Sequence, residues 1–273
     1  MLKQRVITAL ILAIVFVSTI LFADSSWVAV LFALVLFGAT LELLALTTKP
    51  IRPLSIGIAI LFAFGFWIVS HEAGIRINFY QSFAGLMIWV AISGFLLLYQ
   101  FSGHWSLVKR WFHLILSCLA LWICVHALVF VHRHFDQGGW ILLYLLTLVS
   151  VADIGAYFSG RRFGKHKLAP GISPGKTWEG VFGGLVCNLV WMLIVYQLSH
   201  GWGLELWQFI FIGLVTSVMS VAGDLYQSIL KREAGVKDSG KLLPGHGGVL
   251  DRIDSVIAAA PVYVSGLYAV GAV

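Results

Sequence analysis

Polar and charged side chains are concentrated between residues 223 and 254, where one long apolar run ends and another begins. Asp224, Gln227, Ser228 and Lys231 stand at i, i+3, i+4 and i+7, a spacing that places them on one face of a helix. A carboxylate costs roughly 2.5–3.5 kcal/mol at the centre of a membrane-spanning helix. We therefore expect the carboxylates at the end of this run to have a functional role.

The second apolar run begins with Asp251, Asp254 and Ser255, which also share one face of the helix predicted there. Mg²⁺ takes oxygen ligands of this kind, usually one or two carboxylates together with the phosphates of a substrate. The alternative is a set of salt bridges between helices, for example from Asp254 to Arg252 or Lys231. The sequence favours the metal site but leaves the ion pairs open.

A further carboxylate, Asp153, belongs to an earlier apolar run. At a rise of 1.5 Å per residue, Asp153 would lie about 12 Å below Arg161, and Asp224 about 10 Å below Lys231. Two helices would therefore present a carboxylate at similar depth beneath basic residues. This arrangement would suit Asp153 to contact a hard cation.

The segment GISPGKTWEG, residues 171–180, matches a phosphate-binding P-loop in its Gly-Lys-Thr end at Lys176 and Thr177. The first glycine of that motif would fall at position 170, which is Pro170, and no strand is expected before it. The motif of a nucleotide hydrolase is therefore rejected.

The same segment still has the chemistry of an anion site. Ser173 is expected to cap a helix, Pro174 to occupy its first turn, and Lys176 to bind an anion together with free N–H groups. The simpler alternative is a capped helix start whose lysine anchors it at the membrane surface.

The polar loop from 237 to 248 is rich in glycine, including Gly247 and Gly248, so its backbone could approach a phosphate closely. Lys237 and Lys241 add positive charge. His246 is interpreted as a hydrogen-bond donor to phosphate or as a loop strut, in preference to a general acid or base.

The composition is that of a membrane protein. Of the 273 residues, 60% are hydrophobic and 11% are charged, and a soluble domain carries nearer 25% charge. The sequence predicts an all-α, polytopic membrane helix bundle, since a span needs about 20 apolar residues. Nine spans are predicted, at about 5–23, 26–46, 52–70, 82–100, 110–131, 138–160, 177–199, 204–230 and 250–271. Glu42, near the end of the second, is interpreted as a snorkelling or helix-pairing residue.

The basic residues fall almost entirely on one side of this topology. Only Arg76 and Arg133, of the 18 Lys and Arg residues, fall on the other side. By the positive-inside rule the N-terminus is cytoplasmic, the C-terminus lies outside, and the net charge of +6 reflects membrane orientation and not nucleic-acid binding. We expect a scaffold of five spans over 1–135. A catalytic region of four spans over 136–273 follows, with cytoplasmic loops 160–177 and 231–250.

Phosphate-binding groups and carboxylates thus meet at the cytoplasmic face, as suits an enzyme that joins a soluble nucleotide to a lipid phosphate. The spacing from Ser228 to Asp254 closely resembles the signature of the phosphatidate cytidylyltransferases, or CDP-diacylglycerol synthases. The matching positions are Ser228, Lys231, Arg232, Lys237, Asp238, Gly240, Pro244, His246, Gly247, Gly248, Asp251, Arg252 and Asp254. Two earlier elements, Asp153 to Arg161 and Ser173 to Gly180, are also similar to that family.

The resemblance implies that CTP and phosphatidate give CDP-diacylglycerol and diphosphate, with Mg²⁺, in a homodimer of the cytoplasmic (inner) membrane. The family's metal-binding aspartates fall on Asp224 and Asp251, with Asp254 as their support or the ligand of a second cation. The residues that the resemblance implies to be catalytic are Asp224, Asp251, Asp254, Lys237 and His246. The nucleotide- and phosphate-binding residues would be Asp153, Ser173, Lys176, Thr177, Lys231, Arg232, Lys241, Gly247, Gly248 and Arg252.

Two other functions compete with this prediction. A CTP-dependent lipid kinase, such as a polyprenol kinase, would use similar groups to transfer the γ-phosphoryl. An ion-coupled transporter would also place carboxylates within the membrane. Against the transporter, the carboxylates cluster at one face and the sequence has no inverted repeat.

Overall fold

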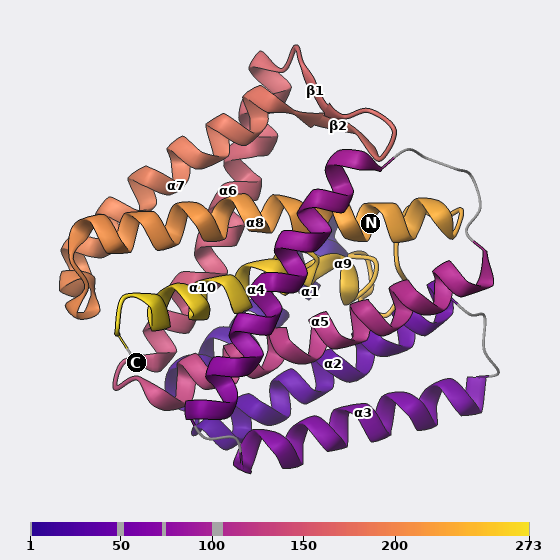
Figure 1. Ribbon diagram of the computed structural model, residues 1–273, viewed down its shortest axis with the longest axis horizontal. Coiled ribbons are helices and arrows are strands. Elements are labelled where there is room, and N and C mark those ends of the chain that lie inside the picture. Colours follow the sequence, from indigo (N-terminus) through magenta and orange to yellow (C-terminus); the bar gives the residue numbers. More distant parts are fainter. Residues whose placement is uncertain (1, 48–51, 73–74, 100–105, 273) are drawn as a thin grey trace. The chain divides into compact units, whose positions relative to one another are not determined.

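The computed structural model describes residues 2–47, 52–72, 75–99 and 106–272, and these are almost entirely helical (Figure 1). The eight longest helices are α1 (Leu2–Phe22), α2 (Ser25–Thr47), α3 (Arg52–Glu72), α4 (Ile75–Leu98), α5 (Leu107–His134), α6 (Gly138–Phe163), α7 (Trp178–Ser199) and α8 (Leu206–Glu233). They are followed by α9 (Leu250–Ile253) and α10 (Val256–Ala269). A 3₁₀ helix, η1 (His200–Gly203), joins α7 to α8.

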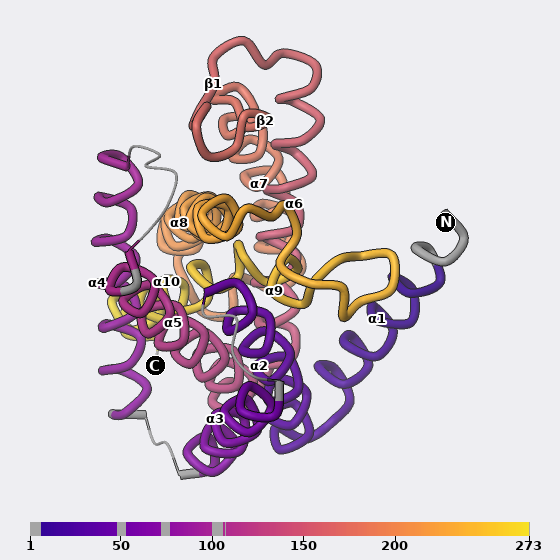
Figure 2. The backbone as a smooth tube through the Cα atoms, turned by 90° about the vertical axis from the view of Figure 1, so that its right-hand side faces the viewer, coloured from indigo at the N-terminus to yellow at the C-terminus, as the bar shows by residue number. Residues whose placement is uncertain are grey.

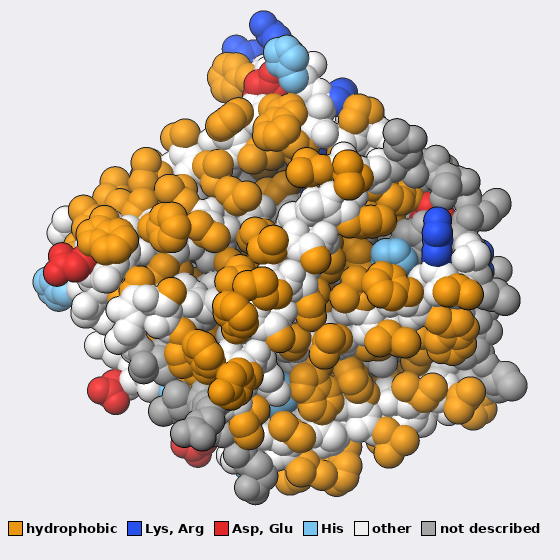
Figure 3. All heavy atoms as spheres, in the orientation of Figure 1, with side chains coloured by type: hydrophobic (Ala, Val, Ile, Leu, Met, Phe, Trp, Pro, Cys, Tyr) orange, Lys and Arg blue, Asp and Glu red, His pale blue; other side chains and the backbone are white. Residues whose placement is uncertain are grey.

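Within the described ranges, seven helices are long and apolar enough to cross a membrane, namely α2 to α8. Helix α1 has a shorter apolar part, Ile7–Phe22, and the 14 residues of α10 span about 21 Å. Large apolar side chains such as Ile14, Leu61 and Phe158 are more than half exposed, as suits contact with lipid. Hydrophobic side chains cover most of the face in Figure 3, and charged groups on it are few. The predicted all-α polytopic bundle is confirmed.

Two details of the prediction are wrong. The final span, predicted as one helix over 250–271, is divided into α9 and α10. The loop 160–177 contains a two-stranded antiparallel hairpin, β1 (Lys167–Ala169) and β2 (Ser173–Thr177). Ser173 and Pro174 therefore lie in a strand, and Thr177 caps α7, its hydroxyl accepting the Gly180 N–H at 3.2 Å. A strand does precede Pro170, although it is a three-residue hairpin strand.

The chain forms two compact units that interleave along the sequence. The first consists of Met1–Asn78, Ser102–Leu143 and Ile229–Asp254, and the second of Phe79–Phe101, Tyr144–Ser228 and Ser255–Val273. The functional division into 1–135 and 136–273 stays a prediction.

The first unit is built around α2, which packs against α3 and α5 and also contacts α9 (Figure 2). Its core side chains include Phe32, Leu36 and Leu43, which are at most 3% exposed. Helix α8 ends in this unit at a Schellman motif. The Val236 N–H bonds to the Lys231 carbonyl and the Gly235 N–H to that of Arg232, with Gly235 at a φ of 74°. This turn starts the polar loop that leads to α9.

The second unit brings α6 and α7 together through glycines. A side-chain carbon at Gly184 would lie 2.7 Å from the Ala152 carbonyl oxygen, and one at Gly180 would lie 2.9 Å from that of Ala156. The absence of side chains at these two glycines therefore allows α6 and α7 to pack closely. The buried Asn188 amide also donates to the Ser217 hydroxyl of α8 at 2.7 Å.

We predict that Gly184→Ala lowers the melting temperature in detergent, because the added methyl group must push α6 and α7 apart. Overpacking of this kind costs about 1–3 kcal/mol. The matched control is Gly94→Ala in α4, where an added carbon would meet no atom within 4 Å. That substitution should leave the melting temperature unchanged or raise it, since alanine favours the helix. Equal melting curves for the two variants would contradict the close contact.

Candidate active site

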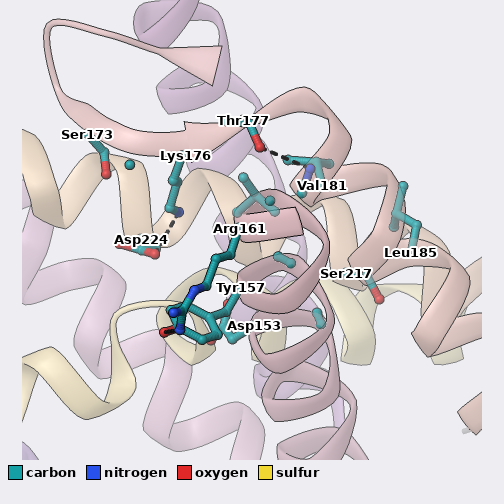
Figure 4. A pocket seen from close by; sticks show the side chains of 17 residues that line it. Asp153, Tyr157, Arg161, Ser173, Lys176, Thr177, Val181, Leu185, Ser217 and Asp224 are labelled. Carbon is teal, nitrogen blue, oxygen red and sulfur yellow. Dashed lines mark hydrogen bonds and ion pairs between the residues drawn. The ribbon is translucent and has the colours of Figure 1, made fainter. Parts of the chain in front are cut away.

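A cavity of about 470 Å³ lies in the second unit, between α6, β2, α7 and α8 (Figure 4). Apolar residues such as Ala156, Leu185 and Val221 line part of its wall. Polar and charged side chains line the rest: Asp153, Tyr157, Arg161, Ser173, Lys176, Thr177, Ser217 and Asp224. Five of these, Asp153, Ser173, Lys176, Thr177 and Asp224, are predicted site residues. The structure therefore brings together residues separated by as many as 71 positions (153 to 224) in the sequence.

An ion pair joins the opposite sides of this cavity. The Lys176 Nζ lies 2.6 Å from the Asp224 Oδ2, and both side chains are about one-quarter exposed, at 24% and 26%. The Ser228 hydroxyl, one turn along α8, donates to the Asp224 Oδ1 at 3.3 Å. Lysine and aspartate thus neutralise each other at a place that remains open to a ligand.

A second carboxylate and a second cation face the same space. Asp153 of α6 accepts a hydrogen bond from the Ser255 hydroxyl at 3.4 Å. Arg161, two turns further along α6, donates to the Tyr157 hydroxyl at 3.3 Å. Figure 4 shows both residues beside Asp153, below the Lys176–Asp224 pair. The cavity therefore holds two carboxylates and two basic groups.

The hairpin fixes Lys176 in place. Lys176 is the penultimate residue of β2, and Thr177 ends the strand and caps α7. The Glu179 carboxylate accepts the His166 N–H at 3.2 Å and lies 2.6 Å from its ring Nδ1. The Lys167 ammonium donates to the Pro174 carbonyl at 2.7 Å. These contacts hold both strands of the hairpin against the start of α7.

A separate cluster of predicted residues lies in the first unit, where α8 ends and α9 begins. The Lys231 ammonium lies 2.8 Å from the Asp251 Oδ1 and 3.7 Å from the Asp254 Oδ2. All three side chains are at most 16% exposed. The ion pair between Lys231 and Asp254, left open by the sequence, is therefore present.

Asp251 is also bonded to the backbone of the polar loop. Its Oδ2 accepts the N–H of Ser239 at 2.9 Å and that of Gly248 at 3.1 Å. Burial acts to raise the pKa of Asp251, but the Lys231 ammonium and the two N–H groups outweigh it and hold the pKa below its ordinary value. Asp251 is therefore the anionic centre around which the loop folds.

The other predicted residues of the loop have varied surroundings. Lys237, Lys241 and Arg252 are exposed, and the Arg232 guanidinium donates to the Val236 carbonyl at 3.2 Å. Gly247 has a φ of 83°, in the region that favours glycine, and its carbonyl accepts the Leu243 N–H. The His246 ring Nδ1 is buried with no hydrogen-bond partner among the described residues. The role of His246 stays a prediction.

For one residue of this cluster, the structure shows a different role from the one that the sequence predicts. Glu42 of α2 was interpreted as a snorkelling or helix-pairing side chain, yet it is buried and accepts hydrogen bonds from the polar loop. Its only sequence signal is a carboxylate near the end of an apolar span. Nothing in the local pattern connects it with a loop about 200 residues further on.

The donor chemistry suits a hard cation, although the described residues contain no group of three or more His, Cys, Asp or Glu side chains arranged for a metal. Asp224 and Asp251 each direct an oxygen at a lysine ammonium, so each carboxylate already binds a cationic group. Mg²⁺ usually takes only one or two carboxylates, with water and phosphate oxygens as its remaining ligands. These carboxylates therefore fit Mg²⁺ as partial ligand sets that a substrate would complete.

A sequence model of the Cytidylyltransferase family matches residues 3–270. Three of the relatives named phosphatidate cytidylyltransferase illustrate the similarity. The one from Haemophilus influenzae is 54% identical over 46% of this chain and 45% of its own length. That from Pseudomonas aeruginosa is 41% identical over 68% of both chains. The one from Staphylococcus saprophyticus is 36% identical over 95% of this chain and 96% of its own. With nearly the whole length matched, the chain belongs to the cytidylyltransferase family.

Proposed function

We propose that the protein is a phosphatidate cytidylyltransferase, which converts CTP and phosphatidate to CDP-diacylglycerol and diphosphate. The relatives carry this name, and one of them aligns over 95% of the chain. The observation that carries the proposal is the cavity of Figure 4, whose wall is apolar on one part and bears Lys176, Asp224 and Asp153 on another. A substrate with acyl chains and a phosphate needs both kinds of wall.

In this reaction a phosphate oxygen of phosphatidate attacks the α-phosphorus of CTP. The new P–O bond forms as the bond from the α-phosphorus to the bridging oxygen of diphosphate breaks, and diphosphate leaves with that electron pair. Such transfers depend mainly on positioning and on neutralising negative charge. No side chain has to form a covalent intermediate.

We assign each predicted site residue a role in this reaction. Lys176 would bind a phosphate of the nucleotide, oriented by Ser173 and Thr177, while Asp153 would contact the nucleotide or a metal ion. Asp224 and Asp251 would hold Mg²⁺, with Asp254 as support. When bound, Mg²⁺ would neutralise phosphate charge. The remaining phosphate-binding groups would be Lys231, Arg232, Lys237, Lys241, His246, Gly247, Gly248 and Arg252.

The proposal extends to the protein's location and assembly. We place it in the inner membrane with the N-terminus and the active site on the cytoplasmic side, because 16 of the 18 basic residues fall on one side of the predicted topology (18 less Arg76 and Arg133). A homodimer is proposed from the family resemblance alone.

Labelled CTP separates the proposed reaction from its nearest competitor. With purified protein, phosphatidate and CTP labelled at the α-phosphorus, we expect the label in the lipid product. Label from the γ position should remain in diphosphate. Transfer of the γ label to lipid would instead identify a lipid kinase. Absence of any CTP consumption, together with ion-driven uptake into vesicles, would favour a transporter.

We predict that Lys176→Ala raises the KM for CTP by about tenfold to a hundredfold, since a hydrogen bond to a charged group contributes about 1.5–3 kcal/mol. Lys165→Ala is the matched control, because Lys165 is an exposed lysine of the same segment that does not line the cavity. Steady-state kinetics in detergent would measure both. If KM and kcat of the Lys176 variant equalled those of the control, this lysine would be only part of an ion pair.

Substitutions of Asp224 and Asp251 test the proposed metal site. Asparagine keeps the size and one acceptor oxygen but removes the charge that holds a hard cation. We expect each single variant to lose most turnover and the double variant to be little worse, since both act on one ion.

The measurement is turnover against Mg²⁺ concentration, alongside a melting curve. If the aspartates served only as ion-pair partners, their substitution would lower the melting temperature and leave the Mg²⁺ dependence of the remaining activity unchanged. Asp136→Asn, at an exposed turn, is the control and should alter neither quantity. Wild-type Mg²⁺ dependence in both test variants would place the metal elsewhere.

A further inference from the structure

The Glu42 side chain is unusual because it is buried, only 4% exposed, and is bonded to a segment about 200 residues away. Its Oε2 accepts the Ser239 hydroxyl and the Leu250 N–H, both at 2.9 Å. Its Oε1 accepts the Val249 N–H at 3.1 Å. Every one of these partners is a donor from the polar loop or the start of α9. Glu42 therefore supplies the acceptors that this backbone would otherwise lack.

Two glycines of the polar loop leave room for this carboxylate because they have no side chain. A side-chain carbon at Gly240 would overlap Glu42, and one at Gly248 would overlap both Glu42 and the Ser239 hydroxyl. The sequence suggested that glycine here lets the backbone approach a phosphate. At these two positions the described contacts give a different reason, which is close approach of the loop to a side chain of α2.

Glu42 and Asp251 accept hydrogen bonds from neighbouring donors of the same segment. Ser239 gives its N–H to Asp251 and its hydroxyl to Glu42. Gly248 gives its N–H to Asp251, and the next two residues give theirs to Glu42. The two carboxylates thus bind different donors of the same two stretches, Ser239 and residues 248–250. The position of either one therefore depends on the other.

We propose that Glu42 is a positioning residue, which fixes the loop from 239 to 250 and through it the orientation of Asp251. It would touch neither nucleotide nor lipid. The role in catalysis rests on the proposed function, but the role in shaping the loop does not. This assigns part of the active-site architecture to the N-terminal region, for which the sequence predicted only a scaffold.

Hydrogen exchange tests the shaping role without any catalysis. In Glu42→Gln the amide NH₂ group replaces one of the two carboxylate oxygens and must face a donor, so either the Val249 N–H or the Leu250 N–H loses its acceptor. We expect amides in 237–252 to exchange about tenfold faster or more, with those of α5 unchanged. Thr47→Val is the matched control, a buried polar residue of the same helix whose hydroxyl bonds only within α2 in the described structure. It should leave exchange in 237–252 unaltered.

Kinetics test the positioning role. We expect Glu42→Gln to lower kcat by about tenfold or more and to raise the Mg²⁺ concentration needed for half activation, with the KM for CTP less affected. Glu42→Asp retains a carboxylate and should restore part of the lost kcat. A side chain that served only stability would lower the melting temperature of the variant but leave kcat and the Mg²⁺ requirement of the folded protein at wild-type values.

If the Glu42→Gln variant does not fold, Ser239→Ala tests both roles of Glu42. It removes the hydroxyl bound to Glu42 but keeps the N–H bound to Asp251, so it should produce the same changes to a smaller extent. Wild-type exchange in 237–252 in either folded variant would overturn the shaping role. Faster exchange with an unchanged kcat would overturn the positioning role. Failure of wild-type protein to consume CTP would instead count against the proposed function and leave the exchange result standing.

Discussion

A carboxylate at the edge of an apolar helix bundle is stable only when hydrogen-bond donors or cations surround it. Three carboxylates of the two clusters meet this requirement in different ways. Asp224 has a lysine and a serine, Asp251 has a lysine and two backbone N–H groups, and Glu42 has two N–H groups and a hydroxyl. The hairpin supplies Lys176, the polar loop and the start of α9 supply the N–H groups and the Ser239 hydroxyl, and α8 supplies Lys231 and Ser228. The conformation of the polar loop satisfies the buried carboxylates of Glu42 and Asp251.

Hydropathy was sufficient to predict the bundle, because a membrane requires long apolar helices whatever their packing. The face shared by Asp224 and Ser228 also followed from helical spacing, and the two residues are hydrogen-bonded. Asp153 and Asp224 were expected at similar depth, and they line one cavity. Helical periodicity thus predicted which residues lie together wherever the chain forms a regular helix.

Prediction was poorest where side chains replace regular backbone hydrogen bonds. The hairpin before α7 has only eight strand residues, 167–169 and 173–177, and its support includes His166, Glu179 and Lys167, which no local pattern identifies. The residue that caps α7 is therefore Thr177, and not Ser173 as the sequence predicted. Glu42 was misjudged for a related reason, since its partners are distant in sequence. A single sequence contains no signal for such pairings, which only tertiary structure creates.

The ion pair between Lys176 and Asp224 has a thermodynamic consequence. With the two charges in contact, neither is fully available to a ligand of opposite sign. A phosphate that attracts the ammonium would release the carboxylate for a cation, and a cation on the carboxylate would release the ammonium for a phosphate. The two ligands would therefore strengthen each other's binding by the same factor, as linkage requires. The cavity would in this respect bind an ion and its counter-ion cooperatively, with a low affinity for either alone.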